Sequence, residues 1–179
     1  MRVPLRRIAQ VGAIALSLVA CASEPPDPRV EAGRLRVQAS AGVSKIQHAL
    51  ESPAIPSREL GEGVQLVEDA ARGLGELEDD PRVSTSQRIG LVLDQARSWE
   101  SASDAIRNAA LLEALDAEQR AALLPVLREK AFPSDVAASS AYRRALMLAC
   151  ESSAHETARE IVAELARRGE RIDGASSCP

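Results

Sequence analysis

Five side chains of this sequence could take part in thiol or imidazole chemistry: Cys21, Cys150, Cys178, His48 and His155. A cysteine can be acylated, joined in a disulfide or bound to a metal, and a histidine can act as a base or as a metal ligand. The two histidines lie far apart in the sequence, and neither has a candidate nucleophile beside it. We therefore expect both to be surface or helix-end side chains, so that the chemistry of the chain rests on its cysteines.

Cys21 ends a segment that has the order of a secretory signal. A basic start is followed by an apolar run from Ile8 to Ala20, which leads into Leu18-Val19-Ala20-Cys21. This pattern resembles the signal peptides of bacterial lipoproteins, in which the cysteine is acylated and the peptide is cleaved just before it. The resemblance implies that residues 1–20 are removed and that Cys21 becomes the lipidated first residue. The protein is then anchored in the bacterial cell envelope, facing the periplasm.

Two other interpretations of the first residues fit less well. A transmembrane helix needs about 20 apolar residues, and this run is shorter and contains Gln10 and Ser17. An ordinary secretory signal would leave Cys21 as an unexplained free thiol. Residues 21–29, with three prolines, are expected to form a short tether from the lipid to the domain. Ala22 directly after the cysteine favours the outer membrane.

The other two cysteines are an even number in a protein expected to be exported to an oxidising compartment. A structural disulfide between Cys150 and Cys178 is the preferred interpretation. It would fasten the C-terminal tail to the start of the last helix. Two free thiols are one alternative, and a metal site made with His155 is another, although the spacing matches no usual zinc pattern.

Composition excludes several classes of function. Of the 22 Lys and Arg residues, Arg2, Arg6 and Arg7 lie in the removed segment, which leaves 19 against 26 Asp and Glu, a net charge of −7. A net-acidic surface argues against binding to nucleic acid or to anionic lipid. The chain has one Trp, one Tyr and one Phe, so it lacks the stacking platform that single-stranded nucleic acid requires.

Searches for catalytic and cofactor motifs find nothing that indicates an enzyme. The sequence contains no Gly-x-Ser-x-Gly, no His-Glu-x-x-His and no phosphate-binding glycine loop. Gly61-Glu62-Gly63 and Gly73-Leu74-Gly75 fall within a helical pattern, where glycine allows helices to approach closely. The acidic stretch Glu76 to Asp80 lacks the spacing of a calcium loop. We expect neither a cofactor nor a metal.

The pattern along the chain is helical throughout, rich in Ala, Leu, Glu and Arg. Residues 57–77 give the clearest case, because apolar side chains recur there at helical spacing. Pro125 predicts a kink or break, and Gly169 predicts a helix end. The expected helices begin near Val30, Ser57, Ser84, Ser101 or Ser103, Asp116, Ser134 and Ser153.

One local resemblance concerns function. Leu115-Asp116-Ala117-Glu118-Gln119-Arg120 and, more faintly, Val83-Ser84-Thr85-Ser86-Gln87-Arg88 resemble the Leu-Thr-x-x-Gln motif of small periplasmic helical proteins. That family, the Spy- and CpxP-like proteins, includes stress chaperones and metal-resistance sensors. Both segments also have the form of a capping box, in which a capping residue is followed three positions later by Gln.

These observations predict a single all-α domain over residues 30–179, built as a compact antiparallel bundle of about six or seven helices, with a flexible C-terminal tail. An irregular helical-repeat stack is the alternative. The expected function is that of a lipid-anchored interaction or accessory protein with an unidentified envelope protein as partner. A periplasmic chaperone or stress or metal sensor is the second hypothesis.

Overall fold

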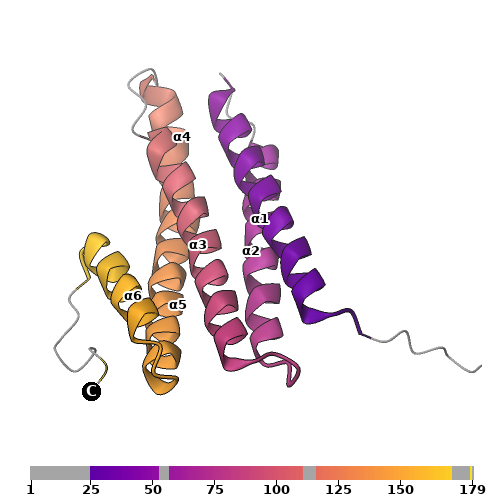
Figure 1. Ribbon diagram of the computed structural model, residues 1–179. Helices are drawn as coiled ribbons and strands as arrows, with labels where there is room; N and C mark the ends of the chain where they lie inside the picture. Colours follow the sequence, from indigo (N-terminus) through magenta and orange to yellow (C-terminus); the bar gives the residue numbers. More distant parts are fainter. Residues whose placement is uncertain (1–24, 53–56, 111–115, 171–177, 179) are drawn as a thin grey trace, which may run out of the picture.

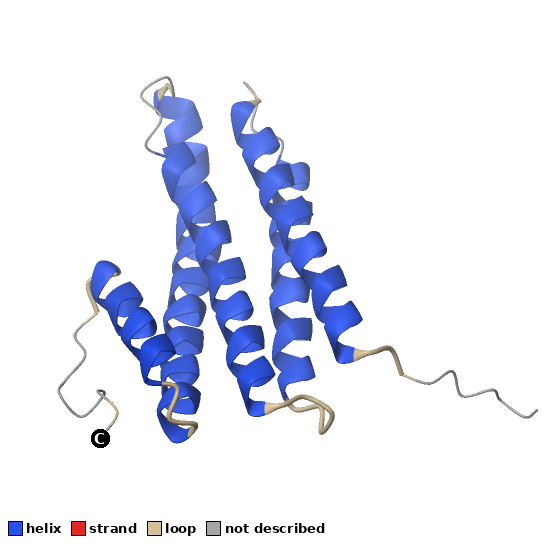
Figure 2. Ribbon diagram, viewed as in Figure 1, coloured by secondary structure: helices blue, strands red, loops and turns tan. Residues whose placement is uncertain are grey.

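The computed structural model describes residues 25–52, 57–110, 116–170 and 178, and every regular element in them is helical. This confirms the all-α prediction (Figure 2). The elements are α1 (Pro28–Glu51), α2 (Ser57–Glu78), α3 (Thr85–Ala110), α4 (Ala117–Val126), the π-helical turn η1 (Leu127–Ala131), α5 (Phe132–Glu151) and α6 (His155–Arg167).

Successive helices run side by side and alternate in direction (Figure 1). Helix α1 packs on α2, and α3 packs on both of them and also on α5, while α6 lies against α5. The start of α1, the α2–α3 loop and the α5–α6 turn all lie at the same end of the molecule. Within the described residues, no helix is long and apolar enough to cross a membrane.

The predicted number of six or seven helices is wrong, because the described residues form five continuous rods. The expected start at Ser101 or Ser103 does not exist. Ser103 is fully buried inside α3, and Ala102 and Ile106 beside it continue the buried face of that helix. Serine caps a helix only where the backbone leaves the helical conformation. At Ser103 the backbone stays helical, because this stretch is packed in the core.

The second difference from the prediction is that α4, η1 and α5 form one rod, although this rod contains two prolines. Pro133 lies in the first turn of α5, where the hydrogen-bond pattern changes from that of the π turn to that of an α-helix. Pro125 lies inside α4 and is followed directly by the π turn, in which the N–H of Phe132 donates to the carbonyl of Leu127. Ser134, the expected cap, instead donates its hydroxyl to the carbonyl of Lys130, at 2.7 Å.

The helix ends test the predicted caps. Helix α1 begins at Pro28 because the side chain of Asp27 accepts a hydrogen bond from the backbone of Arg29, at 2.8 Å. The expected tether is therefore shorter, since its last residues are helical. The predicted end at Gly169 is correct, with a φ of 75°. Ser153 does not cap α6; it has a φ of 58° and terminates α5.

A close helix contact joins α1 and α2 through two glycines. A Cβ atom on Gly42 would lie 2.7 Å from the carbonyl oxygen of Gly63 and 2.7 Å from Cγ2 of Val67. Gly63 is equally confined, because its Cβ would lie 2.9 Å from the carbonyl oxygen of Gly42. Only glycine permits the two backbones to approach this closely. The expectation that Gly63 serves helix packing is thus met, whereas Gly61 faces open space.

Candidate functional site

The predicted lipidation site lies outside the described residues, as do all of residues 1–24. Acylation of Cys21 therefore stays a prediction. The first described residue, Pro25, is separated from Cys21 in the sequence by Ala22, Ser23 and Glu24. A fully extended chain of this length spans at most roughly 14 Å between Cys21 and Pro25.

Cys150 and Cys178 form a disulfide, with their Cα atoms 5.0 Å apart. Cys150 stands in the last turn of α5, and both cysteines pack against the apolar cluster formed by α3, α5 and α6. In the structure both sulfur atoms belong to this bond, so neither is free or available as a metal ligand beside His155. Across the described residues, no group of three or more His, Cys, Asp or Glu side chains could hold a metal.

The two histidines are exposed and lie on different helices, His48 near the end of α1 and His155 at the start of α6. The structure does not bring them together.

The residues that carry the Leu-Thr-x-x-Gln resemblance cap two helices. The amide of Gln119 accepts from the backbone N–H of Asp116 at 3.0 Å, and the carboxylate of Asp116 accepts from the backbone of Gln119 at 2.8 Å. Ser84 and Gln87 repeat this exchange at the start of α3, at 2.8 and 3.4 Å. Each pair satisfies backbone donors that the first turn of a helix leaves open. Leu115 lies outside the described residues.

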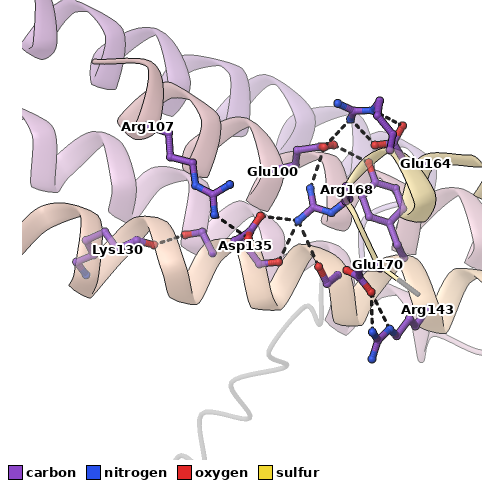
Figure 3. A network of polar contacts seen from close by, with 12 residues as sticks. Glu100, Arg107, Lys130, Asp135, Arg143, Glu164, Arg168 and Glu170 are labelled. Atoms are coloured by element: carbon purple, nitrogen blue, oxygen red, sulfur yellow. Dashed lines mark hydrogen bonds and ion pairs between the residues drawn. The ribbon is translucent and has the colours of Figure 1, made fainter. Parts of the chain in front are cut away.

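A network of charged side chains, centred on Arg168, joins α3, α5 and the end of α6 (Figure 3). The guanidinium of Arg168 donates to Glu100 at 2.9 Å and to Asp135 at 2.6 Å. Its side chain is only 8% exposed. Around it, Tyr142 donates its hydroxyl to Glu100 at 2.7 Å, and Arg107 donates to Asp135 at 2.7 Å.

The network changes the acidity of its members. Burial raises the pKa of Glu100, but the hydrogen bonds from Tyr142 and Arg168 together with the nearby positive charges lower it by a larger amount. The net pKa of Glu100 is therefore below the usual 4.5. Burial and the neighbouring Glu100 carboxylate raise the pKa of Tyr142. Asp104, on the next turn of α3, has a raised pKa because of burial and repulsion by Glu100.

Glu100 and Asp135, the two carboxylates that Arg168 joins, each accept from a guanidinium, so we interpret the network as a structural tie rather than a centre of proton transfer. Sequence reasoning missed it. Glu100 and Arg168 meet only because α3 and α6 both lie beside α5, and nothing local in the sequence marks such a pair.

A second polar contact fixes the chain that leads into α1. The guanidinium of Arg82, in the α2–α3 loop, donates to the backbone carbonyls of Pro25 and Pro26, both at 3.2 Å. Asp80 holds the same guanidinium at 2.7 Å. The hydrogen bond from Arg82 lowers the pKa of Asp80 to about 2. Pro25 and Pro26, shortly before α1, are therefore held against the α2–α3 loop.

Three adjoining hollows form what we call the α1–α3 groove. They share residues: Pro28, Arg29 and Gln87 line both the first and the second, and Arg36 lines both the second and the third. Their volumes are about 630, 410 and 280 Å³, from the Pro25 end onward. The floor is made of small and apolar side chains, including Ala32, Ala39, Val83, Gly90 and Leu91.

Comparison with protein-family models, with curated proteins and with solved structures finds no match to this chain.

Proposed function

We propose that this protein is a lipid-anchored interaction or accessory protein of the bacterial cell envelope, not an enzyme. The observation that supports it best is the contact between Arg82 and the carbonyls of Pro25 and Pro26. It attaches the segment that leads to Cys21 to one end of the helical domain. With so short a lead, an acyl anchor on Cys21 would hold that end beside the lipid, and the outer membrane is the favoured location.

The proposal includes a compact antiparallel bundle rather than an irregular repeat stack. Its support is the packing of α3 on α1, α2 and α5 together, whereas a stack would leave each unit in contact mainly with its neighbours in sequence. Such a bundle can present rigid faces to a protein partner close to the membrane.

Cys21→Ser tests the anchor. The wild-type protein should partition with membranes and give an N-terminal peptide whose mass includes acyl chains on Cys21. The variant should accumulate as a precursor that keeps residues 1–20. Cys150→Ser is the matched control and should be processed normally. Normal maturation of Cys21→Ser, measured by intact mass, would contradict the proposal.

A partner is tested by crosslinking in cells, followed by capture of the tagged, lipidated protein and mass spectrometry. Recovery of a defined envelope protein in near-stoichiometric amount supports an accessory subunit. Recovery of a broad set of unfolded exported proteins contradicts it.

A chaperone of the Leu-Thr-x-x-Gln type is the second candidate. It is favoured by four exposed apolar side chains on the α4–η1–α5 rod, Leu124, Phe132, Val136 and Met147, which are 53%, 56%, 70% and 59% exposed. Large exposed apolar side chains are the contacts that an unfolded client would use. Suppression of client aggregation at substoichiometric amounts would support this function, and no suppression at an equimolar ratio would oppose it.

A further inference from the structure

The α1–α3 groove carries an excess of positive charge on a protein that is otherwise acidic. Four arginines line it, Arg29, Arg36, Arg82 and Arg97, against the carboxylates Asp27 and Asp94. The hollow on the other side of α1, between α1 and α2, has the opposite balance. There Glu31, Asp69, Glu76 and Asp80 outnumber Arg34 and Arg72. The two sides of α1 therefore differ in the charge that they offer to a partner.

The arginines of the groove are not equally engaged. Arg36 pairs with Asp94 at 2.7 Å across the middle of the groove, and Arg82 is held by Asp80 and the proline carbonyls. Arg29 and Arg97 are exposed, and neither forms an ion pair with any residue that the structure describes. Arg29 lies beside the first two hollows and Arg97 lies beside the third, so the two arginines stand toward opposite ends of the groove.

The dimensions of the groove indicate the kind of partner. Gln87, which lines the hollows near Arg29, is about 15 Å along α3 from Arg97 at about 1.5 Å per residue. An extended chain covers this in about five residues. The floor accepts small or apolar side chains on either side of the Arg36–Asp94 pair, because Ala32 and Leu91 line it on one side and Ala39 on the other.

We propose that the α1–α3 groove binds a short acidic segment of a partner protein, with carboxylates that pair with Arg29 and Arg97 and apolar side chains between them. This inference rests on the proposed interaction function and names its surface. The groove starts at the residues that lead to Cys21, so the partner segment would be bound close to the membrane.

The probe is a short labelled peptide that alternates Glu with Leu and Ala, and its binding to full-length protein in detergent is followed by fluorescence anisotropy. The same peptide with Lys or Gln in place of Glu is the control. We expect binding of the Glu peptide alone, weakened by salt because the contacts are between charges. Equal binding of the Lys or Gln peptide would overturn the proposal.

Charge reversal locates the site. The double variant Arg29→Glu, Arg97→Glu should weaken binding of the Glu peptide by at least about tenfold, which corresponds to the loss of one charge-assisted contact. The matched control is Arg72→Glu, an exposed arginine in the hollow between α1 and α2, and it should bind as the wild type does. Circular dichroism verifies that each variant is folded. An equal loss in Arg72→Glu would overturn the assignment to this groove.

Two other occupants are outcomes of the same test. Vesicles containing phosphatidylglycerol that compete with the Glu peptide through Arg29 and Arg97 would assign the groove to lipid instead. Self-association that the double variant abolishes would assign it to a second copy of this chain. Absence of peptide binding by a protein that is acylated on Cys21 overturns the groove proposal and leaves the anchor intact. Peptide binding by a protein that is not acylated on Cys21 supports the groove proposal and overturns the anchor.

Discussion

The guanidinium of Arg168 donates hydrogen bonds to side chains of two other helices. Arg168 is nearly buried, follows the last residue of α6, and donates to Glu100 of α3 and Asp135 of α5. Without Arg168, Glu100 would still accept from Tyr142 and Asp135 from Arg107, but each carboxylate would lose a charge-assisted hydrogen bond.

We therefore expect Arg168→Ala to lower the free energy of unfolding by about 3 kcal/mol. Urea denaturation followed by circular dichroism measures the change. Arg34→Ala is the control, because Arg34 pairs with Glu31 while 58% exposed, and loss of such a surface pair should cost less than about 1 kcal/mol. Equal losses of unfolding free energy in the two variants would show that the network around Arg168 contributes no more stability than a surface ion pair.

The lowered pKa of Glu100 gives stability a defined dependence on pH. Because its folded pKa lies below the usual 4.5, the unfolded chain binds a proton first as the pH falls. The contribution of Glu100 is complete above pH 4.5 and is lost as the pH falls through its folded pKa. Asp104 acts in the opposite sense, since its pKa is raised.

Glu100→Gln should therefore be less stable than the wild type at neutral pH, and the difference should shrink as the pH falls below about 4. Unfolding midpoints in urea at several pH values test this. A constant difference between the two proteins over that range would contradict it.

Prediction from sequence works at this scale where the interaction is local. Asp116 and Gln119 are three positions apart, so their capping box could be recognised directly, and it is present. Ser153 and Glu156 have a similar spacing, yet the left-handed backbone at Ser153 serves the end of α5. Glu100 and Arg168 could not be paired in advance, because only the packing of helices joins them.

At the scale of the helices, the contact of Gly42 with Gly63 sets the distance between α1 and α2. A methyl group on Gly42 would lie 2.7 Å from the carbonyl oxygen of Gly63 and 2.7 Å from Cγ2 of Val67. The two helices would have to move apart to relieve these contacts. We expect Gly42→Ala to destabilise the protein by about 2 kcal/mol, as overpacked substitutions do.

Gly33→Ala provides the contrast on the same helix. Nothing lies within 4 Å of the Cβ position at Gly33, so alanine should stabilise the helix by about 0.5–1 kcal/mol through its higher helix propensity. Thermal and urea denaturation of both variants measure the two effects. Absence of destabilisation in Gly42→Ala would mean that the α1–α2 spacing can adjust, and destabilisation by Gly33→Ala would contradict the open position of Gly33.

Helix type was predictable, whereas the number of helices was not. The spacing of apolar residues identified each helical stretch, but Ser103 and Pro125 were interpreted as interruptions. Ser103 is enclosed between helices, and the π turn directly after Pro125 keeps the rod continuous. The burial of Ser103 depends on neighbouring helices that a single stretch of sequence does not contain, whereas the π turn near Pro125 is a local irregularity of the kind a proline introduces.

At the scale of the whole molecule, the disulfide connects the end of α5 to the C-terminal tail and encloses α6. Cys150→Ser should lower the free energy of unfolding by about 3 kcal/mol under oxidising conditions, because the bond restricts the unfolded chain. The melting temperature measures this. In the presence of a strong reductant the wild type should melt close to the variant, and an unchanged melt without reductant would mean that the bond does not form in solution.

The alternating order of the helices also affects how quickly the protein can fold. Apart from the packing of α3 on α1, the main contacts between helices join rods that are neighbours in the chain, so most helix pairs can form without closing a long loop. Proteins dominated by local contacts fold within microseconds to milliseconds, whereas disulfide formation takes seconds or longer. If the chain crosses a membrane unfolded, its helices will be packed before Cys150 and Cys178 can be oxidised. The bond then locks a fold that is already complete.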